Sequence, residues 1–405
     1  MREMKDSGFD YLGTIPNSWN TISLRYLFRP SAITGRPNAT VLSLYRDHGI
    51  VPKDSRDDNH NVTSLDTSKY KFVRIGDFVI NKMKGWQGSM ALSGYEGIVS
   101  PAYHVFKFIS NKLEPKYAHY LLRSRSYTDE WHKLSTGLRV GQWDLHTNDF
   151  LKTVVPLPPL DEQRRIADHL DAKCAEIDRA VASAEASIEE YKEYERVIIS
   201  EAASGPWPRV RLNRIASFHN GDRSSEYPSG NDIVSKGVPF VTSDALRGRY
   251  IARQFPKHIT RIKYNRLHGA KIRLNDVVFC LRGSVGNCTF NDFLDEGALA
   301  SSLTIARPQR CEGRWLNYVL SASTTMDQAV ASAIGATSQN LAANQLGQVY
   351  VSLPPLDEQR RIADYLDEKC AAIASAIAAK QSIIDDLKVY KQSLIYEVVT
   401  GKREV

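Results

Sequence analysis

The chain has 405 residues, of which 42% are hydrophobic and 24% charged, and its formal net charge is +7. This composition is typical of a globular protein and excludes a disordered or fibrous chain. The length favours two domains over one. No apolar run is long enough to span a bilayer, and the first residues lack the apolar core of a signal peptide. We therefore expect a cytoplasmic protein with no membrane partner.

Positive charge is concentrated in two separate blocks. The net charge is +6 over residues 1–156 and +8 over 205–352, but −6 over 157–204 and −1 over 353–405. A polyanion such as nucleic acid would be attracted to the two basic blocks and not to the segments that follow them. Modest basicity that only aids solubility would give the same values, so charge alone leaves both interpretations open.

A long internal repeat runs through the chain. The sequence LPPLDEQRRIAD occupies residues 157–168 and returns letter for letter at 353–364. Looser similarity upstream pairs Trp19 with Trp207. Solenoid repeats are only tens of residues long, so a repeat of this size indicates a duplicated domain. We expect a mixed α/β fold in which two globular domains are each followed by a long helix, with boundaries at 1–156, 157–204, 205–352 and 353–405.

Both helical segments have the period of a coiled coil. Small or apolar residues recur in alternating steps of three and four over about five heptads. Proline pairs precede both segments, and Gly205 and Gly401 follow them, as expected for helix starts and stops. The two helices most simply pack against each other, so we expect a seam that includes Ile166, Leu170, Ile177, Ile188, Ile362, Leu366, Ile377 and Leu387.

Some apolar residues fall outside this seam. They are Val197 and Ile199 in the first helix and Ile383, Val389 and Ile395 in the second. Two interpretations remain open, because these side chains could pack on the globular domains or receive helices from a partner protein. Within the domains, residues 117–131 and 315–331 each predict a single amphipathic helix.

Recognisable catalytic and metal-binding motifs are missing from the sequence. It contains no phosphate-binding GxxxxGK[ST] loop, no HExxH motif and no paired cysteines with metal-ligand spacing. Its five cysteines are an odd number and widely spaced, which predicts neither disulfides nor a zinc site. Cys174 and Cys370 instead fit the helix seams as small apolar residues. We expect a non-catalytic protein without metal or cofactor.

The combination of proline pair, EQRRIA, long helix and terminal glycine, placed after each basic domain, resembles the specificity subunit of type I restriction–modification systems. KDSGFDYLGTIPNSW at 5–19 is similar to the usual start of that family. The resemblance implies that each target-recognition domain reads half of a split site in double-stranded DNA, while antiparallel helices set the spacer.

The same resemblance implies particular partners. Two modification (methyltransferase) subunits would carry S-adenosylmethionine, and restriction subunits would act as translocases and nuclease with ATP and Mg. On this expectation the cofactors belong to the partner subunits only, and the assembled complex is an adenine-type DNA methyltransferase and ATP-dependent restriction endonuclease.

Candidate DNA contacts are basic and amide side chains in glycine-containing loops, because Arg, Lys, Asn and Gln read base edges while other basic residues hold phosphates. Four loops, at 81–89, 135–144, 281–287 and 335–345, contribute Lys82, Lys84, Gln87, Arg139, Gln142, Arg282, Gln339 and Asn340. Trp86 could stack on a base or pack inside the domain. Arg46, Arg247 and Arg249 are candidate phosphate contacts.

Two other classes of protein compete with the DNA reader. A coiled-coil scaffold without DNA binding would explain the helices but not the two basic blocks. An autonomous methyltransferase or nuclease would need catalytic residues that no motif identifies.

Overall fold

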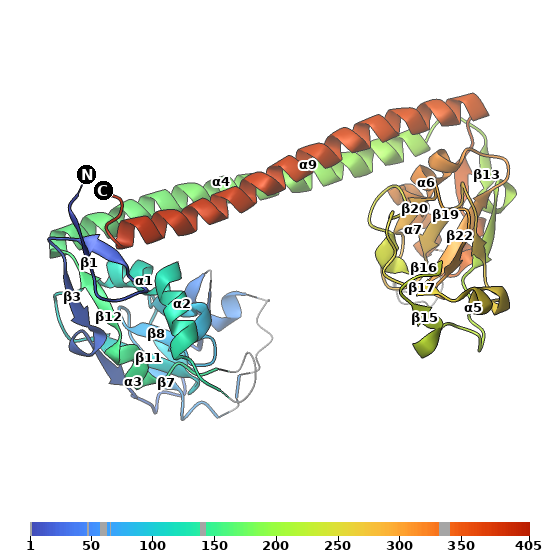
Figure 1. Ribbon diagram of the computed structural model, residues 1–405. Helices are drawn as coiled ribbons and strands as arrows, with labels where there is room; N and C mark the ends of the chain where they lie inside the picture. The colour runs from blue at the N-terminus through green and yellow to red at the C-terminus, as the bar shows by residue number, and fades with distance from the viewer. Residues whose placement is uncertain (1, 47, 57–62, 65, 138–142, 332–340) are drawn as a thin grey trace. The chain divides into compact units, whose positions relative to one another are not determined.

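The computed structural model describes residues 2–46, 48–56, 63–64, 66–137, 143–331 and 341–405. The chain forms two compact units, unit 1 with Met1–Ala184 and Ser382–Val405 and unit 2 with Glu185–Gln381. Each unit combines one β-rich domain with part of two long helices, α4 (Leu160–Ala203) and α9 (Leu356–Val399) (Figure 1). The expected mixed α/β class with two long packed helices is confirmed.

The domain of unit 1 is built on a four-stranded antiparallel sheet with the order β4-β11-β8-β9. Its strands are β4 (Phe28–Ser31), β11 (Tyr103–Phe108), β8 (Phe78–Asn81) and β9 (Met90–Leu92). Successive side chains of a strand point to opposite faces, so large apolar residues at alternating positions bury one face. Here that face packs against the helices beside the sheet. Together they form an aromatic core of Phe28, Phe78, Phe106, Trp131 and Phe150.

Four two-stranded pairs complete unit 1. They are β1 (Met4–Asp6) with β2 (Thr14–Pro16), β3 (Asn20–Ser23) with β12 (Val154–Leu157), β5 (Leu42–Tyr45) with β6 (Gly49–Pro52), and β7 (Lys71–Val73) with β10 (Gly97–Val99). The helices of the domain are α1 (Pro115–Arg123), α2 (Arg125–Leu134) and α3 (Thr147–Lys152).

The domain of unit 2 repeats this plan. Its four-stranded sheet has the matching order β14-β22-β19-β20, from β14 (Ala216–Asn220), β22 (Leu303–Pro308), β19 (Val277–Cys280) and β20 (Cys288–Phe290). Helices α6 (Gly313–Ser321), α7 (Ser323–Ala331) and α8 (Ala343–Gln348) follow it in the chain as α1, α2 and α3 follow the first sheet. Duplication of the sequence is therefore accompanied by duplication of the fold.

Unit 2 also contains elements beyond this shared plan. A five-stranded sheet has the order β15-β17-β16-β21-β18, from β15 (Ile233–Val234), β17 (His258–Ile259), β16 (Val238–Val241), β21 (Gly297–Leu299) and β18 (Lys271–Ile272). The short helix α5 (Arg261–Arg266) follows β17, and β13 (Arg209–Arg211) pairs with β23 (Tyr350–Ser352).

The expectation of one helix at 117–131 and one at 315–331 was wrong. Each region contains two helices, because the chain turns at Ser124 (ψ 158°) in unit 1 and at Ala322 (ψ 137°) in unit 2. The Ser124 hydroxyl donates to the Leu121 carbonyl at 2.7 Å, which satisfies an acceptor at the end of the first helix. The helices on both sides of Ser124 are amphipathic, so the hydrophobic periodicity alone does not reveal the turn between them.

The two long helices pack antiparallel within each unit. In unit 1 the start of α4, at Ile166 and Leu170, shares a core with Leu394 and Val398 near the end of α9. In unit 2 the order is reversed, since Ile198 of α4 lies with the start of α9. Among the expected seam residues, those that are buried are Ile166, Leu170, Ile177, Ile188, Ile362 and Leu366, and those that are half-buried are Ile377 and Leu387.

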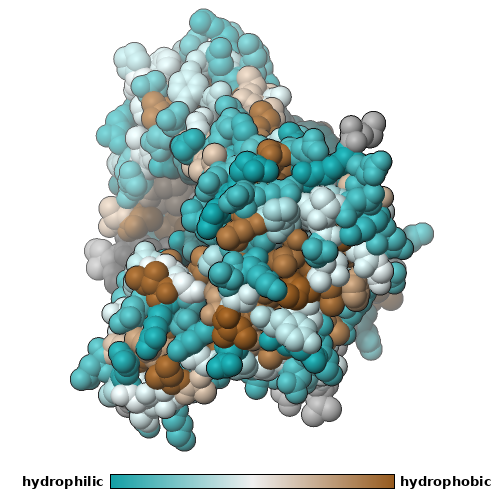
Figure 2. Space-filling model, turned by 90° about the vertical axis from the view of Figure 1, so that its left-hand side faces the viewer, coloured by the Kyte–Doolittle hydropathy of each residue, from teal (hydrophilic) through white to brown (hydrophobic). Residues whose placement is uncertain are grey.

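The apolar residues outside the seam separate into two groups. Ile199 is buried in the core of unit 2, and Ile395 packs against the core of unit 1. By contrast, Val197, Ile383 and Val389 are exposed, at 41%, 49% and 65%. The surface face in Figure 2 shows hydrophobic residues as small groups among hydrophilic ones. In the described part of the chain, none of the helices has the length and apolarity needed to cross a membrane.

The repeated EQRRIA sequence attaches each long helix to the domain that precedes it. Gln163 is fully buried, and its amide donates to the Pro158 carbonyl at 2.9 Å and accepts from the Glu114 N–H at 2.8 Å. Gln359 makes the same two contacts, with Pro354 and Glu312, at 2.8 Å each. Buried amides that are fully hydrogen-bonded fix the local geometry, and removing one leaves its partners unpaired.

We predict that Gln359→Leu lowers the free energy of unfolding by about 2 kcal/mol, because the Glu312 N–H and the Pro354 carbonyl lose their partner. Denaturant unfolding of the full chain measures this. Arg360→Ala is the matched control, since Arg360 is exposed and its ion pair with Asp357 lies at the surface, where such pairs contribute little to stability. Equal stabilities of the two variants would contradict the prediction.

Candidate nucleic-acid interface

In unit 1 the two loops chosen from the sequence lie side by side. The loop at 81–89 joins β8 to β9, and the ends of the second loop are closed by an antiparallel bridge between Thr136 and Asp144. The Leu145 N–H donates to the Lys82 carbonyl at 3.3 Å, and the Lys82 ammonium lies 3.1 Å from an Asp144 carboxylate oxygen. These two contacts join both loops of the first domain into one surface.

Several first-domain candidates gather on this surface. Arg46, in the turn between β5 and β6, donates from its guanidinium to the Gln87 side chain, so that turn reaches the loop at 81–89. Lys84 is exposed. Trp86 packs with Trp143 at a ring separation of 5.2 Å, and its indole N–H donates to the Met83 carbonyl at 3.1 Å. These contacts support the packing interpretation of Trp86. Two further candidates, Arg139 and Gln142, lie outside the described residues.

Unit 2 joins its two loops through an equivalent bond. The loop at 281–287 connects β19 to β20, and the Leu341 N–H donates to the Leu281 carbonyl at 2.9 Å. This bond is equivalent to the one between Leu145 and Lys82, because β19 and β20 occupy the places in their sheet that β8 and β9 occupy in unit 1. Arg282 is exposed on the same loop. The candidates Gln339 and Asn340 lie outside the described residues.

The two candidate phosphate contacts of unit 2 differ in environment. Arg247 is exposed, whereas the Arg249 guanidinium lies 2.9 Å from the Glu195 carboxylate on α4 and 5.1 Å from the centre of the Tyr318 ring. It also donates to the Ser321 hydroxyl at 2.8 Å. Arg249 therefore balances the charge of Glu195 on α4. This internal pairing favours a structural role for Arg249 over the expected phosphate contact.

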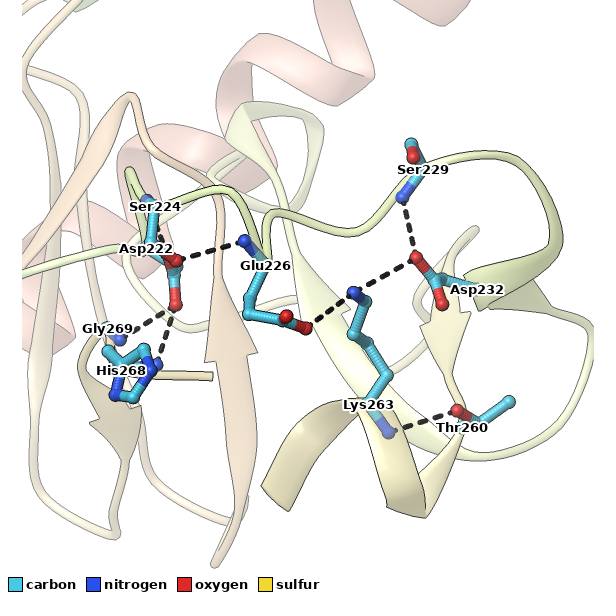
Figure 3. Close-up of polar contacts among 9 residues, drawn as sticks. All are labelled: Asp222, Ser224, Glu226, Ser229, Asp232, Thr260, Lys263, His268 and Gly269. Carbon is cyan, nitrogen blue, oxygen red and sulfur yellow. Dashed lines mark hydrogen bonds and ion pairs between the residues drawn. The ribbon is translucent and has the colours of Figure 1, made fainter. Parts of the chain in front are cut away.

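A fixed turn places one more arginine beside the loop of unit 2. The Asp222 carboxylate accepts hydrogen bonds from Ser224 and from the backbone N–H groups of His268 and Gly269, the latter two at 2.7 and 3.0 Å (Figure 3). Burial raises the pKa of Asp222, but these hydrogen bonds outweigh it and lower the pKa to about 2. The turn is thereby held with its carboxylate ionised.

Farther along this segment, Glu226 and Asp232 lie 3.0 Å and 3.3 Å from the ammonium of Lys263, which is part of α5. Both ends of the segment at 222–232 are thus anchored (Figure 3). Arg223 follows Asp222 and donates to the Ser301 carbonyl at 3.3 Å, next to Ser302, whose carbonyl accepts from Leu281. Sequence reasoning missed Arg223. The Asn-Gly-Asp-Arg turn at 220–223 was the available signal.

Three of the cysteine thiols are poorly suited to act as nucleophiles. Burial raises the pKa of Cys288 and of Cys311 to about 12, and that of Cys370 to about 11. A thiol must ionise to act as a nucleophile, so these cysteines are inert near neutral pH. Among the residues that the structure describes, no group of three or more His, Cys, Asp or Glu could hold a metal ion.

Known proteins resemble this chain in both sequence and fold. A putative type I restriction enzyme MjaX specificity subunit from Methanocaldococcus jannaschii is 22% identical, over 97% of this chain and 96% of the relative. Among solved structures, a chain described under "Structural basis underlying complex assembly and conformational transition of the type I R-M system" has a TM-score of 0.75 at 20% identity, covering 96% of this chain and 99% of that one.

A second solved structure, the HsdS subunit from Thermoanaerobacter tengcongensis, has a TM-score of 0.55 at 20% identity, covering 96% of this chain and 98% of that one. These two structural likenesses concern the fold. The family model described as "Type I restriction modification DNA specificity domain" matches residues 18–182 and again 205–382, which together make up most of the chain. The resemblance noted in the sequence is therefore confirmed, and this chain belongs to the DNA specificity subunits of type I restriction–modification systems, a non-catalytic component of those complexes.

Proposed function

We propose that each domain reads one half of a split target in double-stranded DNA, and that α4 and α9 set the number of unread base pairs between the halves. The observation that carries this proposal is the repeated joining of two polar loops, by Leu145 with Lys82 in unit 1 and by Leu341 with Leu281 in unit 2. Two equivalent loop surfaces on one chain suit two half-sites. Helices of 44 residues are rods of roughly 66 Å, long enough to act as a spacer.

The proposed contacts follow from exposure and charge. Lys82, Lys84 and Gln87 would act in the first half-site and Arg282 in the second, since these side chains sit on the joined loops. Arg46, Arg247 and Arg223 would hold phosphates, while Trp86 and Arg249 support the surface from within. The loop residues outside the described part stay proposed base contacts, namely Arg139, Gln142, Gln339 and Asn340.

The proposed partners are two modification subunits, which carry S-adenosylmethionine, and restriction subunits, which use ATP and Mg. The exposed apolar side chains of Val197, Ile383 and Val389 on the long helices support a protein partner, because burying them against helices would remove apolar area from water. With these partners the chain would act in the cytoplasm, where the DNA substrate lies. It would itself hold no cofactor.

Selection from a random duplex library tests the reader directly. The chain, purified with its modification subunits, should enrich two short fixed blocks separated by a constant gap. A single enriched block would contradict the assignment of one half-site to each domain. Stable assembly without any enrichment would favour a coiled-coil scaffold that does not bind DNA.

We predict that Arg282→Ala and Arg247→Ala weaken DNA binding in different ways. Loss of a base contact at Arg282 should cost about 1–3 kcal/mol of discrimination at one position of the second half-site. Loss of a phosphate contact at Arg247 should weaken all sequences alike and reduce the salt slope by about one. Titrations of target and non-target duplexes at several salt concentrations measure both effects. Unchanged binding by both variants would contradict both assignments.

A further inference from the structure

One carboxylate lies between the two joined loops of unit 1. An Asp144 oxygen is 3.1 Å from the Lys82 ammonium and 3.9 Å from the His146 ring, while its second oxygen is 4.0 Å from the His104 ring. The backbone of Asp144 also pairs with Thr136 in both directions, at 2.8 and 3.2 Å. Asp144 therefore contacts the loop at 81–89 through its side chain and closes the loop at 135–144 through its backbone.

Lys82 is the cation that Asp144 holds most closely. Among the described residues, the second Asp144 oxygen and His104 Nε2 are both buried without a hydrogen-bond partner. Burial lowers the pKa of His104, and the neighbouring cations Lys71 and Lys82 lower it further, although Asp144 opposes them. The His104 imidazole is therefore neutral near pH 7, and the Lys82 ammonium, at 3.1 Å, is closer to the carboxylate than the His146 ring, at 3.9 Å.

The second domain shows that the shared scaffold does not need these charges. Strand pairing places His104 opposite Ile80 in unit 1 and Thr304 opposite Phe279 in unit 2, so Thr304 occupies the place of His104. Leu281 occupies the place of Lys82, because each donates its N–H to the corresponding carbonyl at the start of β11 or β22. Both loops are nevertheless joined in unit 2. The charged group therefore belongs to what is particular to the first domain.

We propose that Asp144 is a positioning residue that determines base preference in the first half-site, by holding the Lys82 ammonium toward one acceptor on a base edge. This inference rests on the proposed function of the domain. An ammonium has three donors, so one can bind Asp144 while the others remain for DNA. The side chain of Lys82 is 39% exposed, which leaves it within reach of a ligand. Guanine O6 and N7 are the acceptors that lysine reads in the major groove.

Releasing Lys82 from Asp144 changes what the lysine does. Its four-carbon stem is flexible, so an unpaired ammonium contacts whichever phosphate or base is nearest. Removing a negative charge beside the DNA also strengthens attraction to any duplex. Loss of Asp144 should therefore reduce discrimination and raise non-specific affinity together. A residue that only stabilised the fold would lower both.

The test compares Asp144→Asn with wild type, using the full chain bound to its modification subunits. We expect discrimination at one position of the first half-site to fall by roughly tenfold or more. Affinity for duplex without the target should rise, and the second half-site should remain unchanged. Lys82→Met should remove the same discrimination, and adding Asp144→Asn to Lys82→Met should cause no further loss, because the two residues act as one unit.

Matched variants separate positioning from other effects. Asp149→Asn removes the same charge from α3 of the same domain and should leave base preference intact, and Asp144→Glu should retain most of it. Wild-type base preference in Asp144→Asn would overturn the inference, as would equal loss of both half-sites, which indicates a purely structural role. Failure of the wild-type chain to enrich two half-sites would instead overturn the proposed function.

Discussion

Each long helix carries an apolar seam that it cannot bury alone, and the burial of these seams is the constraint on which the rest of each unit depends. The start of one helix lies beside the end of the other in both units, and the adjacent domain completes the same core. Gln163 and Gln359 then fix each helix start to its domain through buried amide bonds. Because each core contains residues of both long helices, neither helix holds its place independently of the other.

The duplicated scaffold keeps its geometry while its loop chemistry changes. The sheet order, the turn between successive helices and the backbone bond that joins the loops occur in both domains. The side chains at the join differ, with a lysine and a histidine in unit 1 where unit 2 has Leu281 and Thr304. A reader of two different half-sites needs this combination, since backbone hydrogen bonds hold the loops while side chains remain free to differ.

Periodicity with flanking proline and glycine was sufficient to predict both long helices, because these signals are local. Other features depend on contacts between distant residues. Arg249 has the local appearance of any loop arginine, and only the fold brings Glu195 to its guanidinium. The turn at Ser124 is hidden because the helices on both sides stay amphipathic. The loops were found from composition, but backbone bonds join them, and no side-chain pattern records such bonds.

The central claim, that the domains read DNA and the helices measure the gap, is tested most directly by lengthening the helices. One heptad is inserted after Ala184 in α4 and one before Ser382 in α9, which preserves the seam and adds about 10 Å to each rod. Selection from a random duplex library with the complex should then return both original half-sites with a gap longer by about three base pairs. Recovery of the same half-sites with the original gap would contradict the account.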